Sequence, residues 1–365
     1  MTLLTIGSGH RNFSDFLNPK SRERIAAYGT LVDRSFILAF TRPGFEKQTL
    51  AENVIAFPTN SSSRWLAPFQ AWRMGKAILG LASKGEEIVI SAQDPFESGL
   101  VAWLLRRRSG ARLQLQVHTD FFSPYFRRER WENRVRFRIA KFLLPRADCI
   151  RVVSQRIKRS LESQLKIEAS KIVTLPIWSV PLDAVPQGAA DGAFSILVVA
   201  RLEKEKQIDH ALLAFHKFIK RGGAGKMAIV GDGSERRLLE NLARTLKIHN
   251  QVVFHGWRDN LSHYYAEADV FLVTSQYEGW GVAAADAVYA GIPVVMTDVG
   301  LAGELVRDGG NGIIVPVGDT DAIARALSSI AADPDRFKPR PIRRQESFDE
   351  YLARYREALY RCRRD

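Results

Sequence analysis

The sequence predicts an α/β protein built from two doubly wound, Rossmann-like domains, each with a parallel sheet between layers of helices. Short apolar runs alternate with longer amphipathic runs along the chain, as in parallel strands joined by right-handed helical crossovers. Runs such as 196–200 are apolar throughout, which is typical of strands buried on both faces. The length of 365 residues exceeds one ordinary core and favours two domains.

The strands and helices are expected where these runs lie. Expected strands of the first half are 3–7, 36–40, 53–57, 88–91, 113–118, 150–153 and 172–175. Those of the second half are 194–200, 226–230, 251–255, 270–273, 293–297 and 312–315. The helical runs between the first set include 72–82, 97–107 and 128–144. Runs of this length and alternation predict βαβ units.

Two Pro-rich breaks divide the chain. Residues 181–192 are rich in Pro, Gly and Ala and predict a linker, because Pro resists helix and central strand. The domains are therefore expected at 1–180 and 193–337. A second break, Lys338-Pro-Arg-Pro341, opens the segment 338–365. Its apolar positions at helical spacing, which predict a final amphipathic helix, are Phe348, Leu352, Tyr355 and Leu359.

The composition indicates a soluble globular protein, with 46% hydrophobic and 25% charged residues. No apolar run approaches the roughly 20 residues that span a bilayer, and the first residues lack the features of a signal peptide. Cys149 and Cys362 are the two cysteines, far apart and without metal-ligand spacing. We therefore expect a cytoplasmic protein with neither a disulfide nor a cysteine-based zinc site.

The positive charge is concentrated in the first half of the chain. The net charge is +13; residues 1–185 carry 29 Lys+Arg and 16 Asp+Glu, whereas residues 186–365 carry 24 of each. This asymmetry predicts an anionic partner for the first half: a membrane surface, a phosphorylated lipid or nucleic acid.

A strand–loop–helix unit at 270–286 is the first candidate site. An apolar strand ends near Thr274, a loop with two glycines follows, and helix formers begin at Val282. Ligands bind at the carboxyl ends of strands in such sheets, and amides at a helix start can hold a phosphate. The Glu278 carboxylate can accept hydrogen bonds from sugar hydroxyls, and Asp286 from a second polyol such as a ribose. The alternative is a Gly-rich turn with a surface acid.

A charged loop after the strand at 194–200 is the second candidate. Arg201 and Lys206 follow that strand, and two cations there can hold a diphosphate. Glu203 and Glu205 alternate with the basic residues, so a solvated charged loop is the alternative.

Three motifs together resemble the retaining glycosyltransferases of family 4. They are Ala200-Arg-Leu-Glu-Lys-Glu-Lys-Gln-Ile-Asp209, Val230-Gly-Asp-Gly233 and Glu278-Gly-Trp-Gly-Val-Ala-Ala-Ala-Asp286. The resemblance covers residues 194–330 closely. It implies the GT-B fold, in which two Rossmann-like domains face a cleft and a C-terminal helix crosses back to the N-domain.

The resemblance also implies roles for single residues. Arg201 and Lys206 would bind the donor diphosphate, and Glu278 would be a catalytic residue that contacts the transferred sugar. The remaining donor contacts would be Gly279, Trp280, Gly281, Val282 and Asp286, with His255, Gly256 and Trp257 near the base. Two positions depart from the family pattern: Asp286 stands for Glu, shortening its reach, and Gln207 stands for a Gly whose backbone conformation other residues resist.

The first half matches the family more loosely, through Ala147–Ser154 and a Gly-containing first loop with Gly7 and Gly9. His118 and Asp120 follow an expected strand, where the family often has a His near the reacting sugar. A structural His is the alternative. By resemblance His118 would be catalytic, and Gly7, Gly9 and Asp120 would lie on the acceptor side.

The segment Arg127–Lys141 combines an apolar stripe at helical spacing with a dense set of basic residues. The stripe is Trp131, Val135, Ile139 and Phe142. One interpretation is a helix packed on the core with a solvated basic face; the other is docking to an anionic membrane surface. The two are compatible if the stripe packs and the arginines dock.

We therefore expect transfer of a sugar, with retention, from a nucleotide-diphosphate donor to a hydroxyl of a glycan or lipid-linked acceptor in cell-envelope glycan assembly. The protein would be cytoplasmic or peripheral on the inner face of the membrane. No Asp-x-Asp motif occurs at these sites, so we expect no metal and no cofactor. The alternatives are a basic nucleic-acid-binding protein, which lacks a recognised module here, an inactive sugar-nucleotide-binding scaffold, and an epimerase of the same fold.

Overall fold

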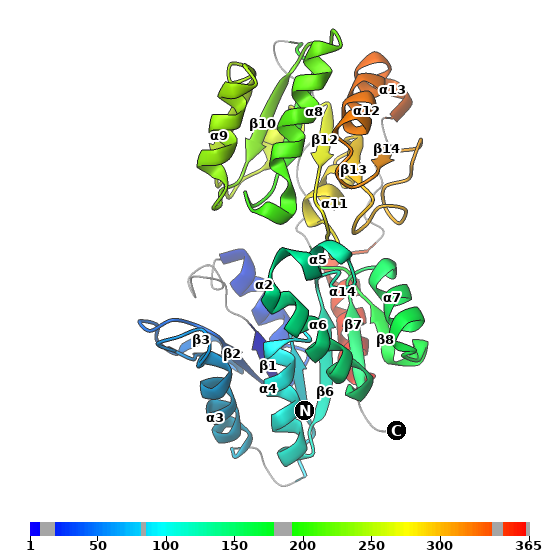
Figure 1. Cartoon of the computed structure of the whole chain (residues 1–365). Helices are drawn as coiled ribbons and strands as arrows, with labels where there is room; N and C mark the ends of the chain where they lie inside the picture. Colours follow the sequence, from blue (N-terminus) through cyan, green and yellow to red (C-terminus); the bar gives the residue numbers. More distant parts are fainter. Residues whose placement is uncertain (8–18, 82–84, 179–191, 338–345, 363–365) are drawn as a thin grey trace. The chain divides into compact units, whose positions relative to one another are not determined.

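The computed structural model describes residues 1–7, 19–81, 85–178, 192–337 and 346–362 (Figure 1). The chain divides into two compact units. Unit 1 comprises Met1–Pro176 and Glu346–Asp365, and unit 2 comprises Ile177–Gln345. The predicted linker 181–192, apart from Gly192, and the break at 338–341 lie outside the described residues.

Unit 1 contains an eight-stranded sheet in the described part of the chain, in the order β3-β4-β2-β1-β5-β6-β7-β8. Its strands are β1 (Thr2–Gly7), β2 (Arg34–Ala39), β3 (Gln48–Ala51), β4 (Val54–Pro58), β5 (Ile88–Ala92), β6 (Arg112–Val117), β7 (Cys149–Val152) and β8 (Ile172–Thr174). Neighbouring strands are parallel except at the edge strand β3, which runs antiparallel to β4. The strand order reverses between β1 and β5, so their carboxyl ends form a topological switch point.

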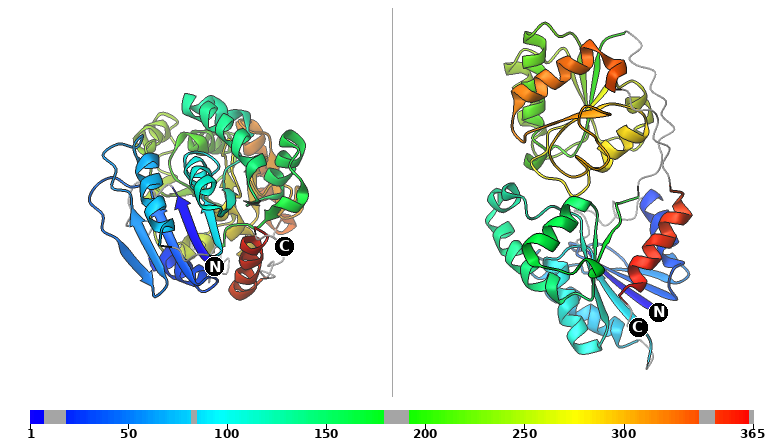
Figure 2. Two further views of the ribbon diagram at one scale, coloured as in Figure 1. Left: turned by 90° about the horizontal axis from the view of Figure 1, so that it is seen from below. Right: turned by 90° about the vertical axis from the view of Figure 1, so that its right-hand side faces the viewer.

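The helices of unit 1 cover both faces of this sheet. They are α2 (Pro19–Gly29), α3 (Ala67–Leu79), α4 (Glu97–Ser109), α5 (Pro124–Glu129), α6 (Trp131–Leu143), α7 (Gln155–Leu165) and α14 (Phe348–Tyr360). Helix α4 packs between α3 and α6. Figure 2 shows α14 beside α2, on the other side of the sheet from α6, and the Tyr28 and Tyr355 rings stack there with centroids 4.3 Å apart.

The C-terminal helix is tied to the sheet of unit 1. A Ser347–Glu350 capping box begins α14. The Arg151 guanidinium donates to the Tyr351 hydroxyl at 2.9 Å. Cys362, just after the helix, forms a disulfide with Cys149 of β7, with Cα atoms 5.2 Å apart. The prediction of unpaired cysteines is therefore wrong, because the returning helix brings together two residues separated by 213 positions.

Unit 2 contains a six-stranded parallel sheet within its described residues, in the order β11-β10-β9-β12-β13-β14. The strands are β9 (Ser195–Val199), β10 (Lys226–Val230), β11 (Val252–Gly256), β12 (Val270–Val273), β13 (Val294–Thr297) and β14 (Gly312–Val315). The helices are α8 (Ile208–Lys220), α9 (Arg236–Thr245), α10 (Ser262–Ala266), α11 (Val282–Tyr289), α12 (Thr320–Ala332) and α13 (Pro334–Phe337).

Separate apolar clusters bury the two faces of this sheet. Phe215 and Phe218 of α8 centre one, and Tyr265 with Phe271 centres the other. The strand order reverses between β9 and β12, which places a second switch point at their carboxyl ends. The predicted fold class, two parallel-sheet α/β halves, is confirmed.

The differences from the predicted elements are local. The expected helix 128–144 is two helices, α5 and α6, because Arg130 between them is extended at φ −143° and ψ 149°. The short edge strand β3 was not predicted. Across the described ranges, no helix combines the length and the hydropathy needed to cross a membrane.

Candidate functional site

A cavity of about 190 Å³ lies in unit 2 at the carboxyl ends of β9 and β12. Its polar lining comes from three predicted site residues, Arg201, Lys206 and Glu278, together with Thr274 and Ser275. The start of α11 closes one side through Gly281 and Val282. The structure therefore brings the two predicted diphosphate-binding cations and the predicted catalytic Glu278 to one cavity.

Lys206 and Glu278 form an ion pair in the lining of this cavity. Lys206 Nζ lies 2.5 Å from Glu278 Oε1, and their side chains are 15% and 16% exposed. The Ser275 hydroxyl donates to the same Oε1 at 2.8 Å. The carboxylate is therefore held by a cation and a hydroxyl at the strand end.

The loops after β9 and β12 are joined by hydrogen bonds to backbone carbonyls. The Gln276 amide donates to Glu205 O at 2.8 Å. The Thr274 hydroxyl lies 2.9 Å from Lys206 O and 2.8 Å from Gln207 O. Arg201 differs from Lys206: its side chain is 64% exposed and pairs with Glu205 at 2.9 Å. Lys206 is fixed by both loops, whereas Arg201 extends into solvent.

Gln207 adopts the left-handed conformation that the family pattern assigns to Gly, with φ 46° and ψ 49°. It lies between a 3₁₀ turn, Lys204–Lys206, and α8. Its side-chain Oε1 is buried without a hydrogen-bond partner in the described structure. The loop therefore places Gln207 in a backbone conformation that favours Gly, at the cost of strain that a Gly would not carry.

The motif 278–286 forms the entry to α11. Gly279 is buried, and Gly281 caps the helix with φ 100°. Trp280 packs against the apolar cluster on its face of the sheet. Its carbonyl accepts from the Leu301 amide at 2.9 Å. Gly300, not predicted from the sequence, fits tightly here, because a Cβ would lie 2.3 Å from Trp280 O.

Asp286 lies in the second turn of α11 and does not line this cavity. Burial of Tyr265 raises the pKa of its hydroxyl well above the usual value, and the negative charge of Asp286 adds to this rise. The Tyr265 hydroxyl donates to Ala283 O at 3.0 Å. The ribose contact predicted for Asp286 therefore remains a prediction.

The turn after β10 supports the Arg201 loop sterically. A Cβ on Gly231, whose φ is 136°, would lie 1.9 Å from Ala200 O. A Cβ on Gly233 would lie 2.4 Å from Leu202 O. Both glycines are needed because the two loop backbones touch.

Of the residues predicted near the base, His255 and Gly256 end the edge strand β11 and Trp257 follows it. His255 stacks edge-on against Tyr264, with centroids 4.8 Å apart, and burial lowers its pKa. Gly256 has φ 70°, and Trp257 is exposed, with its Nε1 donating to Asp259 at 3.3 Å. These three residues lie outside the cavity lining.

In unit 1, the predicted acceptor-side Gly7 and the predicted catalytic His118 lie at the carboxyl ends of two strands of the same sheet. Gly7 ends β1, and His118 follows β6, with β5 between them. His118 Nε2 is 3.0 Å from Gln116 Oε1, and its Nδ1 is buried without a partner among the described residues. Burial, with Arg151 and Arg24, lowers the pKa of His118 to about 3. Gly9 lies outside the described residues.

Asp120 serves the turn that leads to α5. Its Oδ1 accepts from the Phe122 amide at 3.1 Å, and burial raises its pKa. The structure shows His118 paired with Gln116 rather than with Asp120. No group of three His, Cys, Asp or Glu side chains suited to a metal ion occurs in the part of the chain that the structure describes.

Curated relatives match parts of this chain. An exopolysaccharide phosphotransferase of Streptomyces coelicolor is 30% identical over 191 residues, covering 52% of this chain and 20% of that protein. An uncharacterized glycosyltransferase of Methanocaldococcus jannaschii is 36% identical over 148 residues, covering 40% and 38%. The chain thus spans well under half the length of these relatives.

Solved structures share the fold along nearly the whole chain. A sucrose-phosphate synthase from Thermosynechococcus elongatus aligns with a TM-score of 0.76 at 21% identity, covering 99% of this chain and 95% of the other. Anabaena HepE in complex with UDP-glucose aligns with a TM-score of 0.68 at 17% identity, covering 99% and 94%.

Family models account for most of the sequence. Residues 34–178 match a glycosyl transferase 4-like domain, and residues 182–350 match glycosyl transferases group 1. The second range contains the cavity, the Lys206–Glu278 pair and all three quoted motifs. The chain belongs to the group 1 glycosyl transferases, with a glycosyl transferase 4-like domain preceding the group 1 domain.

Proposed function

We propose that this protein is a glycosyltransferase that moves a sugar from a nucleoside-diphosphate donor to a hydroxyl of a glycan or lipid-linked acceptor, with retention at the anomeric carbon. The observation that carries the proposal is the Lys206–Glu278 pair beside the start of α11, inside the cavity at the β9/β12 switch point. Cation, carboxylate and helix-start amides meet where doubly wound sheets bind nucleotides.

The polar groups match the parts of such a donor. The diphosphate leaving group gains negative charge as the glycosidic bond breaks, and Lys206, Arg201 and the amides at Gly281 would offset that charge. Glu278 would accept hydrogen bonds from the sugar hydroxyls. A bound diphosphate would compete with Glu278 for Lys206, leaving the carboxylate available to the sugar. Because a neighbour of the same fold was solved with UDP-glucose, UDP-sugars are the first donors to test.

Retention is proposed without a covalent intermediate. Among the described residues lining the cavity, Glu278 is the one carboxylate, and its proposed role there is to bind the sugar hydroxyls. A double displacement requires a free carboxylate as nucleophile. Attack on the face that the leaving group vacates requires none, and we favour it.

We also propose that no metal ion takes part. The two cations and the helix-start amides supply the positive charge that a metal would otherwise bring to the diphosphate. Transfer should survive a chelator. Loss of activity that magnesium or manganese restores would contradict this part of the proposal.

The central experiment is a panel of nucleoside-diphosphate sugars scored by thermal shift, because a ligand of the folded state raises stability by mass action. The donor that stabilises the protein is then incubated with acceptors, and the anomeric configuration of the product is read by NMR. A retained anomer supports the proposal. An inverted product would overturn retention, and binding without transfer or hydrolysis would indicate an inactive scaffold.

The rival nucleic-acid function makes a separate prediction. Salt-sensitive RNA binding with no response to any nucleotide sugar would favour it. Interconversion of free nucleotide sugars without transfer to an acceptor would instead identify an epimerase.

A further inference from the structure

Helix α6 presents apolar side chains to solvent. Trp131 is 64% exposed, and Val135 and Phe142 are each 42% exposed. Three of the four stripe residues are therefore exposed and only Ile139 is half-buried, so the interpretation in which the whole stripe packs on the core does not hold. The inward face of α6 carries instead Asn133, Ala140 and Leu143.

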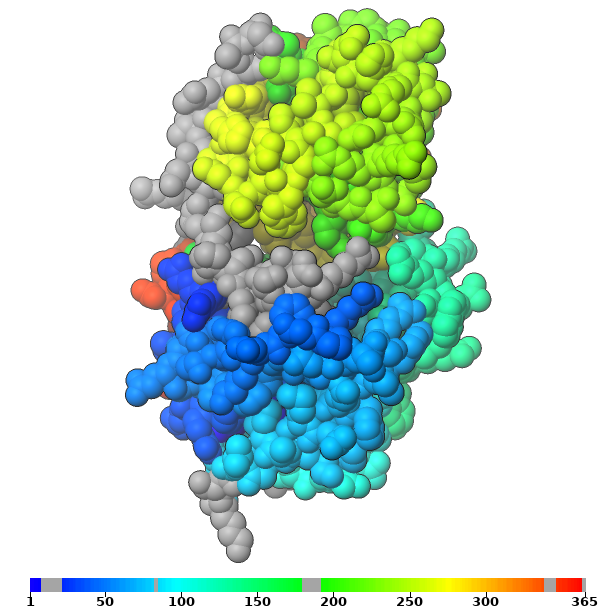
Figure 3. All heavy atoms as spheres, turned by 90° about the vertical axis from the view of Figure 1, so that its left-hand side faces the viewer, coloured from blue at the N-terminus to red at the C-terminus, as the bar shows by residue number. Residues whose placement is uncertain are grey.

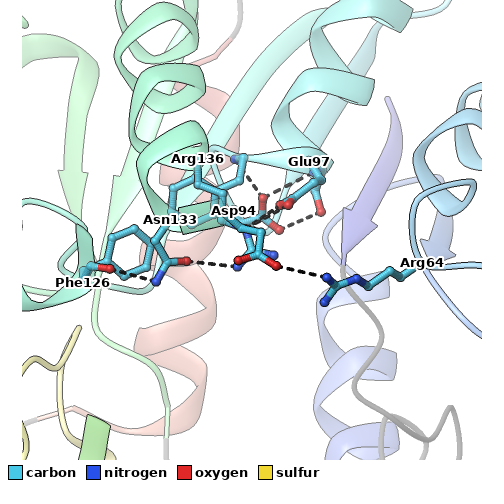
Figure 4. Close-up of polar contacts among 9 residues, drawn as sticks. Arg64, Asp94, Glu97, Phe126, Asn133 and Arg136 are labelled. Carbon is cyan, nitrogen blue, oxygen red and sulfur yellow. Dashed lines mark hydrogen bonds and ion pairs between the residues drawn. The ribbon is translucent and has the colours of Figure 1, made fainter. Parts of the chain in front are cut away.

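Polar contacts fix this orientation of α6. The Asn133 side-chain amide donates to Phe126 O at 2.8 Å, and Arg136 Nε donates to Glu97 at 2.8 Å. Figure 4 shows Asn133, Arg136 and Glu97 pointing toward one another between the helices. Because these polar groups hold the inner face, the apolar stripe points outward.

Exposed apolar residues from the start of α3 continue the stripe. Trp65, Leu66 and Phe69 are 60%, 47% and 55% exposed. The Trp65 ring stacks on Trp131 with centroids 6.4 Å apart, and Arg64 bonds Glu132 beside them at 3.1 Å. In Figure 3 the light-blue surface around α3 adjoins the teal surface of the α5–α6 region. We call Trp65, Leu66, Phe69, Trp131 and Val135 the aromatic ridge.

A basic pocket of about 440 Å³ lies between α5 and α6. Five cations line it around Phe137: Arg127, Arg128, Arg134, Arg138 and Lys141. The Arg127 guanidinium and Lys141 Nζ lie 4.8 and 5.8 Å from the Phe137 ring centroid. No carboxylate lines the pocket, and none of the five cations forms an ion pair within the described structure.

Two other arginines of this region do have carboxylate partners. Arg130 pairs with Glu129, and Arg136 pairs with Glu97. Five like charges around one hollow repel one another unless an anion neutralises them. The pocket is therefore complementary to a polyvalent anion such as a phosphate group.

The basic pocket and the aromatic ridge share one surface of α6. Trp131 and Arg134 are three positions apart, as are Val135 and Arg138, so each apolar residue neighbours a pocket cation on the helix surface. Helix α5 and the Trp65 loop follow the carboxyl ends of β6 and β4. They therefore lie on the side of the sheet where the strands have their carboxyl ends, as do Gly7 and His118.

We propose that this surface docks unit 1 onto an anionic phospholipid bilayer, with the basic pocket around headgroup phosphates and the aromatic ridge in the interfacial layer. Trp side chains favour that layer, and clustered Arg and Lys favour anionic lipid. A nucleic-acid backbone would satisfy the cations but leave Leu66, Phe69 and Val135 in water. Docking of this kind would hold the carboxyl-end side of this sheet, where the predicted acceptor-side residues lie, against the membrane. The membrane is the source of a lipid-linked acceptor.

The test is co-sedimentation of the full chain with phosphatidylcholine vesicles, with and without phosphatidylglycerol. We expect binding that requires the anionic lipid. The pocket variant Arg134→Gln/Arg138→Gln should bind about tenfold or more weakly. The matched control Arg237→Gln/Arg244→Gln removes the same charge from exposed positions of α9 and should bind within about twofold of the unaltered protein, because those positions lie outside the docking surface.

The ridge is tested separately from the charge. Trp131→Ser/Val135→Ser should weaken sedimentation without changing net charge, and anionic vesicles should shift the tryptophan emission of the unaltered protein to the blue but not that of this variant. Retained thermal unfolding and donor-induced stabilisation show that each variant is folded and separate this proposal from the glycosyl-transfer one.

Four results would overturn the proposal. They are equal binding to neutral vesicles, binding to neither kind, a control variant as weak as the pocket variant, and a ridge variant that binds like the unaltered protein. Full competition by inorganic phosphate at low concentration would show a site for the free ion. Salt-sensitive capture of RNA in place of vesicles would show a nucleic-acid surface.

Discussion

Lys206 Nζ and Glu278 Oε1 lie 2.5 Å apart in the cavity of unit 2. The cation predicted to bind the donor diphosphate is therefore ion-paired with the carboxylate predicted to contact the sugar. Glu278→Ala should lower the rate of sugar transfer at least about a hundredfold, because the carboxylate stabilises the transition state. Lys206→Ala should mainly raise the donor KM, about tenfold, because it binds the diphosphate before and during the reaction. Steady-state kinetics separate the two effects.

A control for these variants is Glu240→Ala, which removes an ion-paired carboxylate from the surface of α9. Its kinetics should match those of the unaltered protein. Normal transfer by both Glu278→Ala and Lys206→Ala would show that the site lies elsewhere.

Gln207 predicts a stabilising substitution. Its φ of 46° is unfavourable for a residue with a Cβ, so Gln207→Gly should raise the free energy of unfolding by about 0.5–1 kcal/mol. Gln207→Ala retains the Cβ and should give no such gain. Denaturant unfolding at equilibrium measures both; a destabilised Gly variant would mean that the Gln side chain holds the loop.

Gly231 predicts the opposite result. A Cβ there would lie 1.9 Å from Ala200 O at a φ of 136°, so Gly231→Ala should destabilise unit 2 by about 3 kcal/mol or more and weaken donor binding by displacing the Arg201 loop. Gly222 has a φ of 88° but open space around it. Gly222→Ala should therefore cost only about 1 kcal/mol, and equal losses would refute the steric argument.

His118 predicts a pH dependence of stability. Burial lowers its pKa to about 3, whereas the pKa of a histidine in an unfolded chain is about 6.5. Between these values the unfolded chain binds a proton that the folded protein does not, so stability falls as the pH is lowered. From about pH 7.5 to about pH 5, the unaltered protein should lose on the order of 1–2 kcal/mol more than His118→Gln. Denaturant unfolding of the unaltered protein and of His118→Gln at each pH measures the difference. Equal losses of stability in the two proteins would show that His118 is exposed to water.

Most of the fold follows from local patterns. The apolar runs predicted β10, β12 and β14 at their observed bounds, because buried parallel strands are apolar along their whole length. The edge strand β3 was missed, since four residues beside one neighbour carry too little pattern. The split between α5 and α6 was missed because it depends on the extended backbone of Arg130 alone.

Long-range features were not predictable from local sequence. The Cys149–Cys362 disulfide depends on where α14 returns, and the outward stripe of α6 depends on which partners Asn133 and Arg136 meet. In the site, motif spacing brought Arg201, Lys206 and Glu278 together correctly. The close contact of Gly300 with Trp280 O is a steric relation between two loops, and no residue pattern in either loop reports it.

The return of α14 to unit 1 has a consequence for synthesis on the ribosome. Strands β1 to β8 emerge first, but Tyr28 and Arg151 lack their neighbours on α14 until the chain beyond Glu346 appears. At roughly 5–20 residues per second, the approximately 170 residues of unit 2 delay that event by about 10–30 s. Unit 2 is continuous in the chain and can fold during this interval. The half of the protein that is translated first is therefore the half that is finished last.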